Sequence, residues 1–99
     1  MNRNMLKQVQ QLQAKIQKTQ EDLGNETVEG TAGGGAVRIV MSGHQKVESV
    51  AIEPEAVEDL EMLQDMIVTA INDAQEKVGA LVQQRMGPLT AGMNLPGLF

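Results

Sequence analysis

Hydrophobic residues recur at helical spacing in two stretches of the chain, one near each end. In the first stretch they alternate at intervals of four and three residues, the a and d pattern of a helix that packs against another helix. This set is Met5, Val9, Leu12, Ile16, Thr19 and Leu23. Gly24 and Asn25 follow it, as residues of this kind often do at a helix C-terminus. The pattern therefore predicts a helix of the coiled-coil type.

The second stretch begins near Asp59, which is suited to an N-cap, and runs to about Met86. Its apolar set is Leu60, Leu63, Ile67, Ile71, Ala74, Val78 and Leu81. The two predicted helices would each be roughly 30 to 40 Å long at 1.5 Å per residue. Gly87 and Pro88 predict the end of the second helix, so residues 87–99 are expected to form a flexible tail and residues 1–86 a single domain.

Between the helices, three short segments have the composition of strands: residues 26–29, 37–41 and 47–53. The third carries Val50 and Ile52 on one face. The glycine-rich link GTAGGGAV, residues 30–37, lacks the spacing of a phosphate-binding loop and precedes a strand rather than a helix. It therefore predicts a hairpin turn that uses positive φ angles. Residues 42–45 predict a second turn, and Pro54 ends the sheet.

The predicted fold class is α+β, with the order α-β-β-β-α, a small antiparallel sheet and two long helices. Three short strands cannot cover helices of this length, and the sheet would keep an open edge, so we expect a homodimer. The residues expected to pack, within one chain or between two, are Met5, Val9, Leu12, Ile16, Val50, Ile52, Leu63, Ile67 and Ile71.

The composition argues against catalysis, cofactors and metals. There is no cysteine, and the one histidine, His44, cannot form a zinc site alone. Ser42, His44 and Ser49 lack the arrangement of a catalytic triad and are better explained by a turn. The acids between residues 53 and 61 lack the alternating ligands of a calcium loop. No apolar run approaches membrane-spanning length, so a cytoplasmic protein without a membrane partner is expected.

The charge is divided unequally along the chain. The formal net charge is −5, yet residues 1–20 contain four bases and no acid, whereas residues 21–99 contain four bases and thirteen acids. The four bases Arg3, Lys7, Lys15 and Lys18 lie on the side of the first helix away from its apolar stripe. Such a face would contact phosphates, with salt-sensitive and weakly sequence-selective binding. An ordinary solvated helix face is the alternative.

Four segments together resemble the YbaB/EbfC family of bacterial nucleoid-associated proteins. They are LKQVQQLQAKIQKTQEDL, VEGTAGGGAVRIVMSGHQKVESVAIEPE, DLEMLQDMIVTAINDAQEK and the GMNLPG of the tail. The resemblance implies a homodimer with a joint sheet and projecting helices that bind double-stranded DNA in the nucleoid and affect gene expression. It also implies frequent encoding beside replication and recombination genes, which suggests a role in repair with replication or recombination proteins as partners.

The same resemblance places DNA contacts on the projecting helices, at Arg3, Lys7, Lys15, Lys18, Lys77 and Arg85. The second helix is strongly acidic through Glu76, so only its far end is expected to join such a contact. The alternative function is a non-enzymatic adaptor in which the heptad stripes or the acidic second helix bind another protein.

Overall fold

The computed structural model describes residues 3–90 and has the predicted order α-β-β-β-α, which confirms the fold class. The elements are α1 (Arg3–Leu23), β1 (Thr27–Ala32), β2 (Val37–Ser42), β3 (Val47–Ile52) and α2 (Leu60–Thr90). Short 3-10 turns at Gly33–Gly35 and Pro54–Glu58 join β1 to β2 and β3 to α2. Asp59 caps α2 as predicted, because its Oδ1 accepts the backbone N–H of Met62 at 3.1 Å.

The three strands form one antiparallel sheet in the order β1-β2-β3. Gly30 of β1 lies opposite Ile39 of β2, which in turn lies opposite Val50 of β3. The link between β1 and β2 turns the chain through Gly33, Gly34 and Gly35, whose φ angles are 62°, 69° and 98°. Side chains rarely adopt this left-handed conformation, so the prediction of a glycine turn is confirmed.

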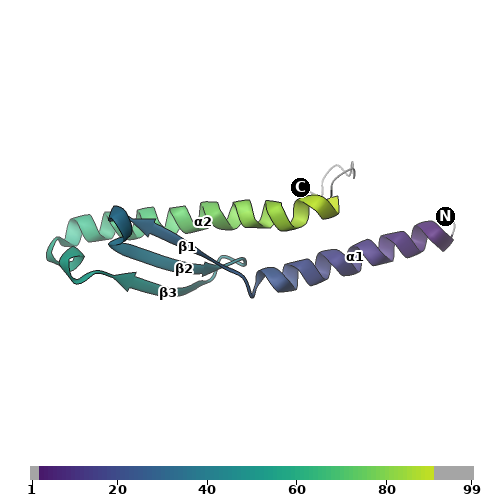
Figure 1. The fold of residues 1–99 in the computed structure, drawn as a ribbon, viewed down its shortest axis with the longest axis horizontal. Coiled ribbons are helices and arrows are strands. Elements are labelled where there is room, and N and C mark those ends of the chain that lie inside the picture. The colour runs from purple at the N-terminus through teal and green to yellow at the C-terminus, as the bar shows by residue number, and fades with distance from the viewer. Residues whose placement is uncertain (1–2, 91–99) are drawn as a thin grey trace.

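The core lies between α2 and one face of the sheet (Figure 1). Val37, Ile39 and Met41 alternate along β2 and are fully buried, as the period of two requires of a strand with one covered face. The buried residues that α2 contributes are Leu63, Ala70, Ala74 and Val78. Gly30 allows α2 to approach β1 closely, because a Cβ at this position would overlap the carbonyl oxygen of Ala70.

The second helix continues past the predicted end near Met86 and reaches Thr90, with Pro88 in its last turn. The residue before Pro88 is Gly87, which has no Cβ to clash with the proline ring, so the usual restriction on that position is relaxed. The hydroxyl of Thr90 also donates to the carbonyls of Met86 and Gly87, at 3.2 and 3.3 Å. The predicted tail beyond Thr90 lies outside the described residues.

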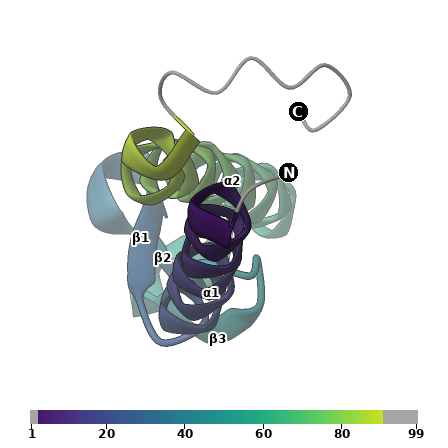
Figure 2. The ribbon, with the colours of Figure 1, turned by 90° about the vertical axis from the view of Figure 1, so that its right-hand side faces the viewer.

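The first helix projects from the sheet, with its C-terminal half beside the end of α2 and its N-terminal half extending past the last described turn of α2 (Figure 1). The described chain is therefore 67 Å long. Viewed along this axis, α1 lies below α2 and in front of the sheet (Figure 2). Leu23 is the one buried residue of α1, and the rest of the helix is exposed or half-buried. No helix within residues 3–90 has the length and apolar character needed to cross a membrane.

Candidate nucleic-acid interface

The four bases of α1 are exposed and point away from the part of the helix that packs. Arg3, Lys7, Lys15 and Lys18 are all solvent-exposed, and within residues 3–90 none of them forms an ion pair. Leu12, Ile16 and Thr19, on the apolar stripe, are half-buried. Because the bases have no acidic partner to neutralise them, this face is open to an anionic ligand such as a phosphate. We call these four residues the basic face.

Lys77, also predicted to contact DNA, is held by the protein itself. Its Nζ donates to the backbone carbonyl of Glu29 at 2.8 Å and pairs with Asp73 at 3.1 Å. Asp73 Oδ2 in turn accepts the backbone N–H of Thr31 at 2.9 Å. That hydrogen bond, and then Lys77, hold the pKa of the Asp73 carboxyl below its usual value. These two side chains of α2 thus form hydrogen bonds with backbone groups along the outer edge of β1.

Arg85, the last of the six predicted contacts, is bound to Glu26 by a two-pronged ion pair. Its Nε donates to Oε2 at 3.0 Å, and its Nη2 donates to Oε1. The hydrogen bond to Arg85 lowers the pKa of Glu26, and the same bond raises the pKa of Arg85. Of the six predicted bases, the structure therefore has four open on α1 and two engaged with acids beside β1. The Asp73–Lys77 spacing of four residues was a signal of this pairing in the sequence.

The predicted packing residues fall into three groups. Leu63 is in the core, with Ile67 and Ile71 packed at its margin. On α1, Leu12 and Ile16 are half-buried, whereas Met5 and Val9 are exposed. The remaining two, Val50 and Ile52 of β3, are 51% and 38% exposed although they belong to the same sheet face as the core.

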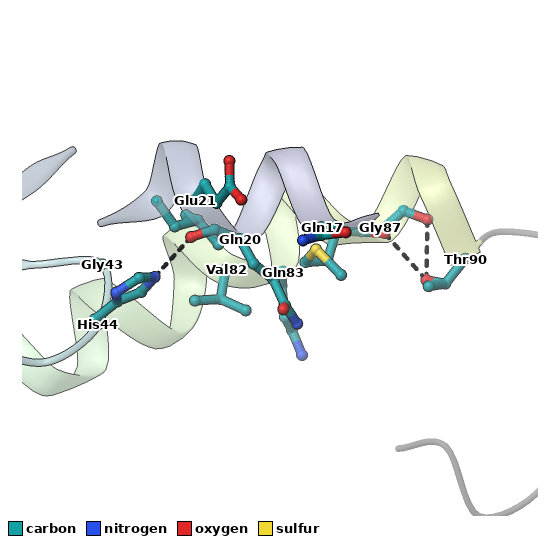
Figure 3. Close-up of a pocket in the computed structure, with 11 residues that line it drawn as sticks. Gln17, Gln20, Glu21, Gly43, His44, Val82, Gln83, Gly87 and Thr90 are labelled. Atoms are coloured by element: carbon teal, nitrogen blue, oxygen red, sulfur yellow. Dashed lines mark hydrogen bonds between the residues drawn. The ribbon is translucent and has the colours of Figure 1, made fainter. Parts of the chain in front are cut away.

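A groove of about 1060 Å³ separates the C-terminal half of α1 from that of α2 (Figure 3). Gln17 and Gln20 line it from α1, Val82 and Gln83 from α2, and His44 from the β2–β3 turn. The Nε2 of His44 donates to the backbone carbonyl of Gln20 at 2.6 Å (Figure 3). Amides and apolar groups predominate in this lining, so the groove is not a phosphate site and the basic face lies elsewhere on α1.

Ser42 and His44 form a turn, as predicted. The Ser42 hydroxyl accepts the backbone N–H groups of His44 and Lys46, both at 3.2 Å. Gln45 donates from its backbone to the carbonyl of Ser42 at 2.8 Å, with a φ of 63°. Within residues 3–90, no three acidic or histidine side chains are grouped so as to hold a metal ion.

The sequence profile described as the YbaB/EbfC DNA-binding family matches residues 1–93. The chain belongs to this family. Its YbaB/EbfC relatives include a "nucleoid-associated protein" of Desulforamulus reducens, 54% identical over 97 residues, a match that covers 96% of this chain and 92% of the relative. A "nucleoid-associated protein" of Chloroflexus aurantiacus is 50% identical over 99 residues, covering 98% and 97%. This is a family of nucleoid-associated, DNA-binding proteins, a class defined by binding rather than catalysis.

The YbaB/EbfC fold also has a counterpart among solved structures. A crystal structure of an uncharacterized protein from Helicobacter pylori matches with a TM-score of 0.77 and 19% sequence identity. The match covers 90% of this chain and 97% of the other. At this low identity the likeness concerns the fold, which is therefore retained with few residues in common.

Proposed function

We propose that this protein is a dimeric nucleoid protein that binds double-stranded DNA through the basic face of α1, with little preference for sequence. The observation that supports this most directly is the separation of charge along the molecule. Residues 77–90 of α2, of which Val82 to Thr90 border the groove beside α1, contain Lys77 and Arg85 but no acid. The acids of α2 lie between Glu61 and Glu76, over the sheet. Contacts to phosphates hold DNA without reading its bases.

The place of action that follows is the chromosome in the cytoplasm. A protein that coats DNA through its phosphates would influence nucleoid organisation and, by occupying promoters, gene expression. Both effects depend on the amount of protein bound rather than on a recognition sequence. They are therefore tested only after DNA binding itself has been measured.

The two edges of the sheet support dimerisation at β3. At the β1 edge, Asp73 takes the N–H of Thr31 and Lys77 takes the carbonyl of Glu29. A second strand cannot add where these backbone groups are already bonded. Within residues 3–90, the outer edge of β3 has no such cover and no partner strand.

An apolar surface adjoins this open edge. Cross-strand partners share a face of the sheet, so Val50 and Ile52 point to the same side as Ile39 and Val37. The helix α2 packs over β1 and β2, while β3 is the strand farthest from it (Figure 1). A second copy joined at β3 would extend the sheet and bury this surface against its own β3 and α2. Two basic faces would then be presented to one duplex.

Fluorescence anisotropy with a labelled random-sequence duplex tests the proposal from about 50 to 200 mM salt, where phosphate-driven affinity should fall steeply. If roughly four to six phosphates are neutralised per dimer, the logarithm of affinity falls with that of salt at a slope of about −4 to −5. The variant Lys7→Glu/Lys15→Glu should abolish binding and still sediment as a dimer. Unchanged affinity would remove these residues from the interface.

The matched control is Arg38→Glu/Lys46→Glu, which changes the net charge equally but on the sheet and the β2–β3 turn. It should retain most of the affinity, because these bases lie outside α1. Equal loss in both double variants would mean that overall charge, rather than the basic face, governs binding. No binding by the unchanged protein at the lowest salt would refute the proposed function.

An adaptor that binds another protein is the second candidate, favoured by one observation. Val57, in the 3-10 turn before α2, and Leu60, Met62 and Val68, in the first turns of α2, are all more than half exposed. Large apolar side chains left in water are candidate contacts for a protein partner. Replacing Leu60 and Met62 with Ser should leave DNA affinity unchanged under the DNA-binding proposal, whereas an adaptor would lose its partner, including any replication or recombination protein.

A further inference from the structure

The last turn of α1, which we call its root, packs against the turn that follows β2. Leu23 is 3% exposed, and its carbonyl accepts the backbone N–H of Gly43 at 3.0 Å. The same N–H also reaches the carbonyl of Glu26 at 3.0 Å. A Cβ at Gly43 would overlap the carbonyl oxygen of Leu23, so the turn after β2 touches the end of α1 directly. The direction of α1 is therefore set where it meets the sheet.

Two side chains from other elements hold this root on either side. His44, in the β2–β3 turn, donates to the carbonyl of Gln20 in the last turn of α1 at 2.6 Å (Figure 3). Arg85, in α2, binds Glu26, three residues after the last residue of α1. The His44 contact holds the last turn of α1, and the Arg85 contact holds the segment between α1 and β1.

We infer that Glu26, Arg85 and His44 are positioning residues that set the direction of α1, and we call these three residues the clamp. In this role Arg85 acts through its ion pair with Glu26 and not by touching DNA. The inference rests on the proposed function of the basic face. Before the last turn of α1, every described residue of this helix is exposed or half-buried, and the half-buried ones are Leu12, Ile16 and Thr19. Glu26, Arg85 and His44 therefore supply much of what restrains the direction of this long helix.

Because α1 is long, a small rotation of the helix at its root produces a large displacement of the basic face. Lys7 is sixteen residues from Leu23, or about 24 Å along the helix at 1.5 Å per residue. A rotation of about 10° at the root would move Lys7 by about 4 Å, more than the length of a hydrogen bond to a phosphate. The two basic faces of a dimer would no longer be held at one spacing.

Removing the charge of Glu26 distinguishes two roles for Arg85, as part of the clamp or as a direct contact with DNA phosphates. If Arg85 binds phosphate, Glu26 competes with DNA, and Glu26→Gln should tighten binding and steepen the salt slope by about 0.9 for each arginine released. If Arg85 is a clamp, the same variant should weaken binding by several-fold although the protein becomes less acidic. The two roles thus predict opposite signs.

A distance measurement tests the clamp without DNA. The chain has no cysteine, so Gln10→Cys on α1 and Gln75→Cys on α2 give two unique sites for spin labels. Diluting labelled protein with unlabelled chains restricts the signal to pairs within one chain. We expect one narrow distance distribution for the parent, a broader one for Glu26→Gln and for His44→Ala, and a narrow one again for the swap Glu26→Arg/Arg85→Glu.

Glu29→Gln is the matched control, because it removes the same charge from the face of β1 that points away from α2. It should leave the distance distribution unchanged and raise DNA affinity slightly. An unchanged distribution in Glu26→Gln, or tighter DNA binding with a steeper salt slope, would overturn the inference. If the parent binds no DNA, the proposed function fails, whereas the distance distributions still decide whether these residues hold α1.

Discussion

The close contact between β1 and α2 leads to a quantitative prediction for Gly30→Ala. A Cβ at this position would overlap the carbonyl oxygen of Ala70 and lie 2.5 Å from the nitrogen and 2.7 Å from the Cβ of Ala74. The atoms of Ala70 and Ala74 nearest to it belong mainly to the backbone of a helix, so no side-chain rotation can relieve the overlap. The whole of α2 would have to retreat by roughly 1.3 to 1.8 Å to restore an ordinary contact of about 3.5 to 4.0 Å to the carbonyl oxygen of Ala70.

Such a retreat should be costly because the packed core moves with it. Overpacking of a core costs about 1 to 3 kcal/mol, and the upper end applies where only backbone can yield. The hydrogen bond of 2.9 Å from Thr31 to Asp73 would also lengthen. For a domain of this size, 1 kcal/mol corresponds to about 4 to 8 °C in Tm. We therefore expect Gly30→Ala to lower the Tm by about 12 to 24 °C.

The control is Gly79→Ala, the same chemical change in the middle of α2, where an added Cβ meets no atom within 4 Å. Alanine is favoured over glycine in a helix by about 0.8 to 1.0 kcal/mol, so this variant should raise the Tm by about 3 to 8 °C. Far-UV circular dichroism at one fixed chain concentration is the suitable assay, because the chain has no Trp or Tyr and dimers melt in a concentration-dependent way. A Tm for Gly30→Ala within about 2 °C of the parent would refute the reasoning.

Two further predictions concern the edges of the sheet. Asp73 has a lowered pKa in the folded protein, so its stabilisation is complete at neutral pH and is lost as the pH falls below about 4, through the lowered value. In urea unfolding, Asp73→Asn should be less stable than the parent at pH 7, and the gap should narrow steadily as the pH falls below about 4. A gap of constant size down to the lowest pH at which the parent still folds would contradict this. Val50→Lys should sediment as a monomer, because it places a charge on the proposed dimer surface, whereas Ser49→Lys, on the opposite face, should remain dimeric.

Local pattern was sufficient to predict the elements and their order. Helical periodicity identified both helices, and Asp59 marked the start of α2, since these signals depend on neighbours within a few residues. The glycine turn was predictable for the same reason. The end of α2 at Thr90 was not, because Gly87 tolerates the proline after it and Thr90 closes the last turn through its own hydrogen bonds.

The availability of the bases was harder to predict than their positions. Arg85 and Glu26 are 59 residues apart, so no local signal could pair them, and the sequence alone left Arg85 as a DNA contact. Asp73 and Ala74 belong to one of the segments that resemble the family, but only the structure gives their roles. Asp73 accepts the N–H of Thr31 at the edge of β1, and Ala74 packs against Gly30, where a Cβ would overlap it.

The geometry of the chain explains how an acidic protein can present a cationic surface. Within α1 the only acids are Glu21 and Asp22, in the last turn, while Lys7 is about 24 Å from the root of the helix at 1.5 Å per residue. Charges in water are screened over about 8 Å at physiological salt. The acids therefore contribute little at the N-terminal end of α1, and DNA bound as proposed would meet Arg3 and Lys7 there without nearby acids. By this reasoning, shortening α1 would weaken binding even if every base were kept, because the bases would come within the screening length of the acidic body.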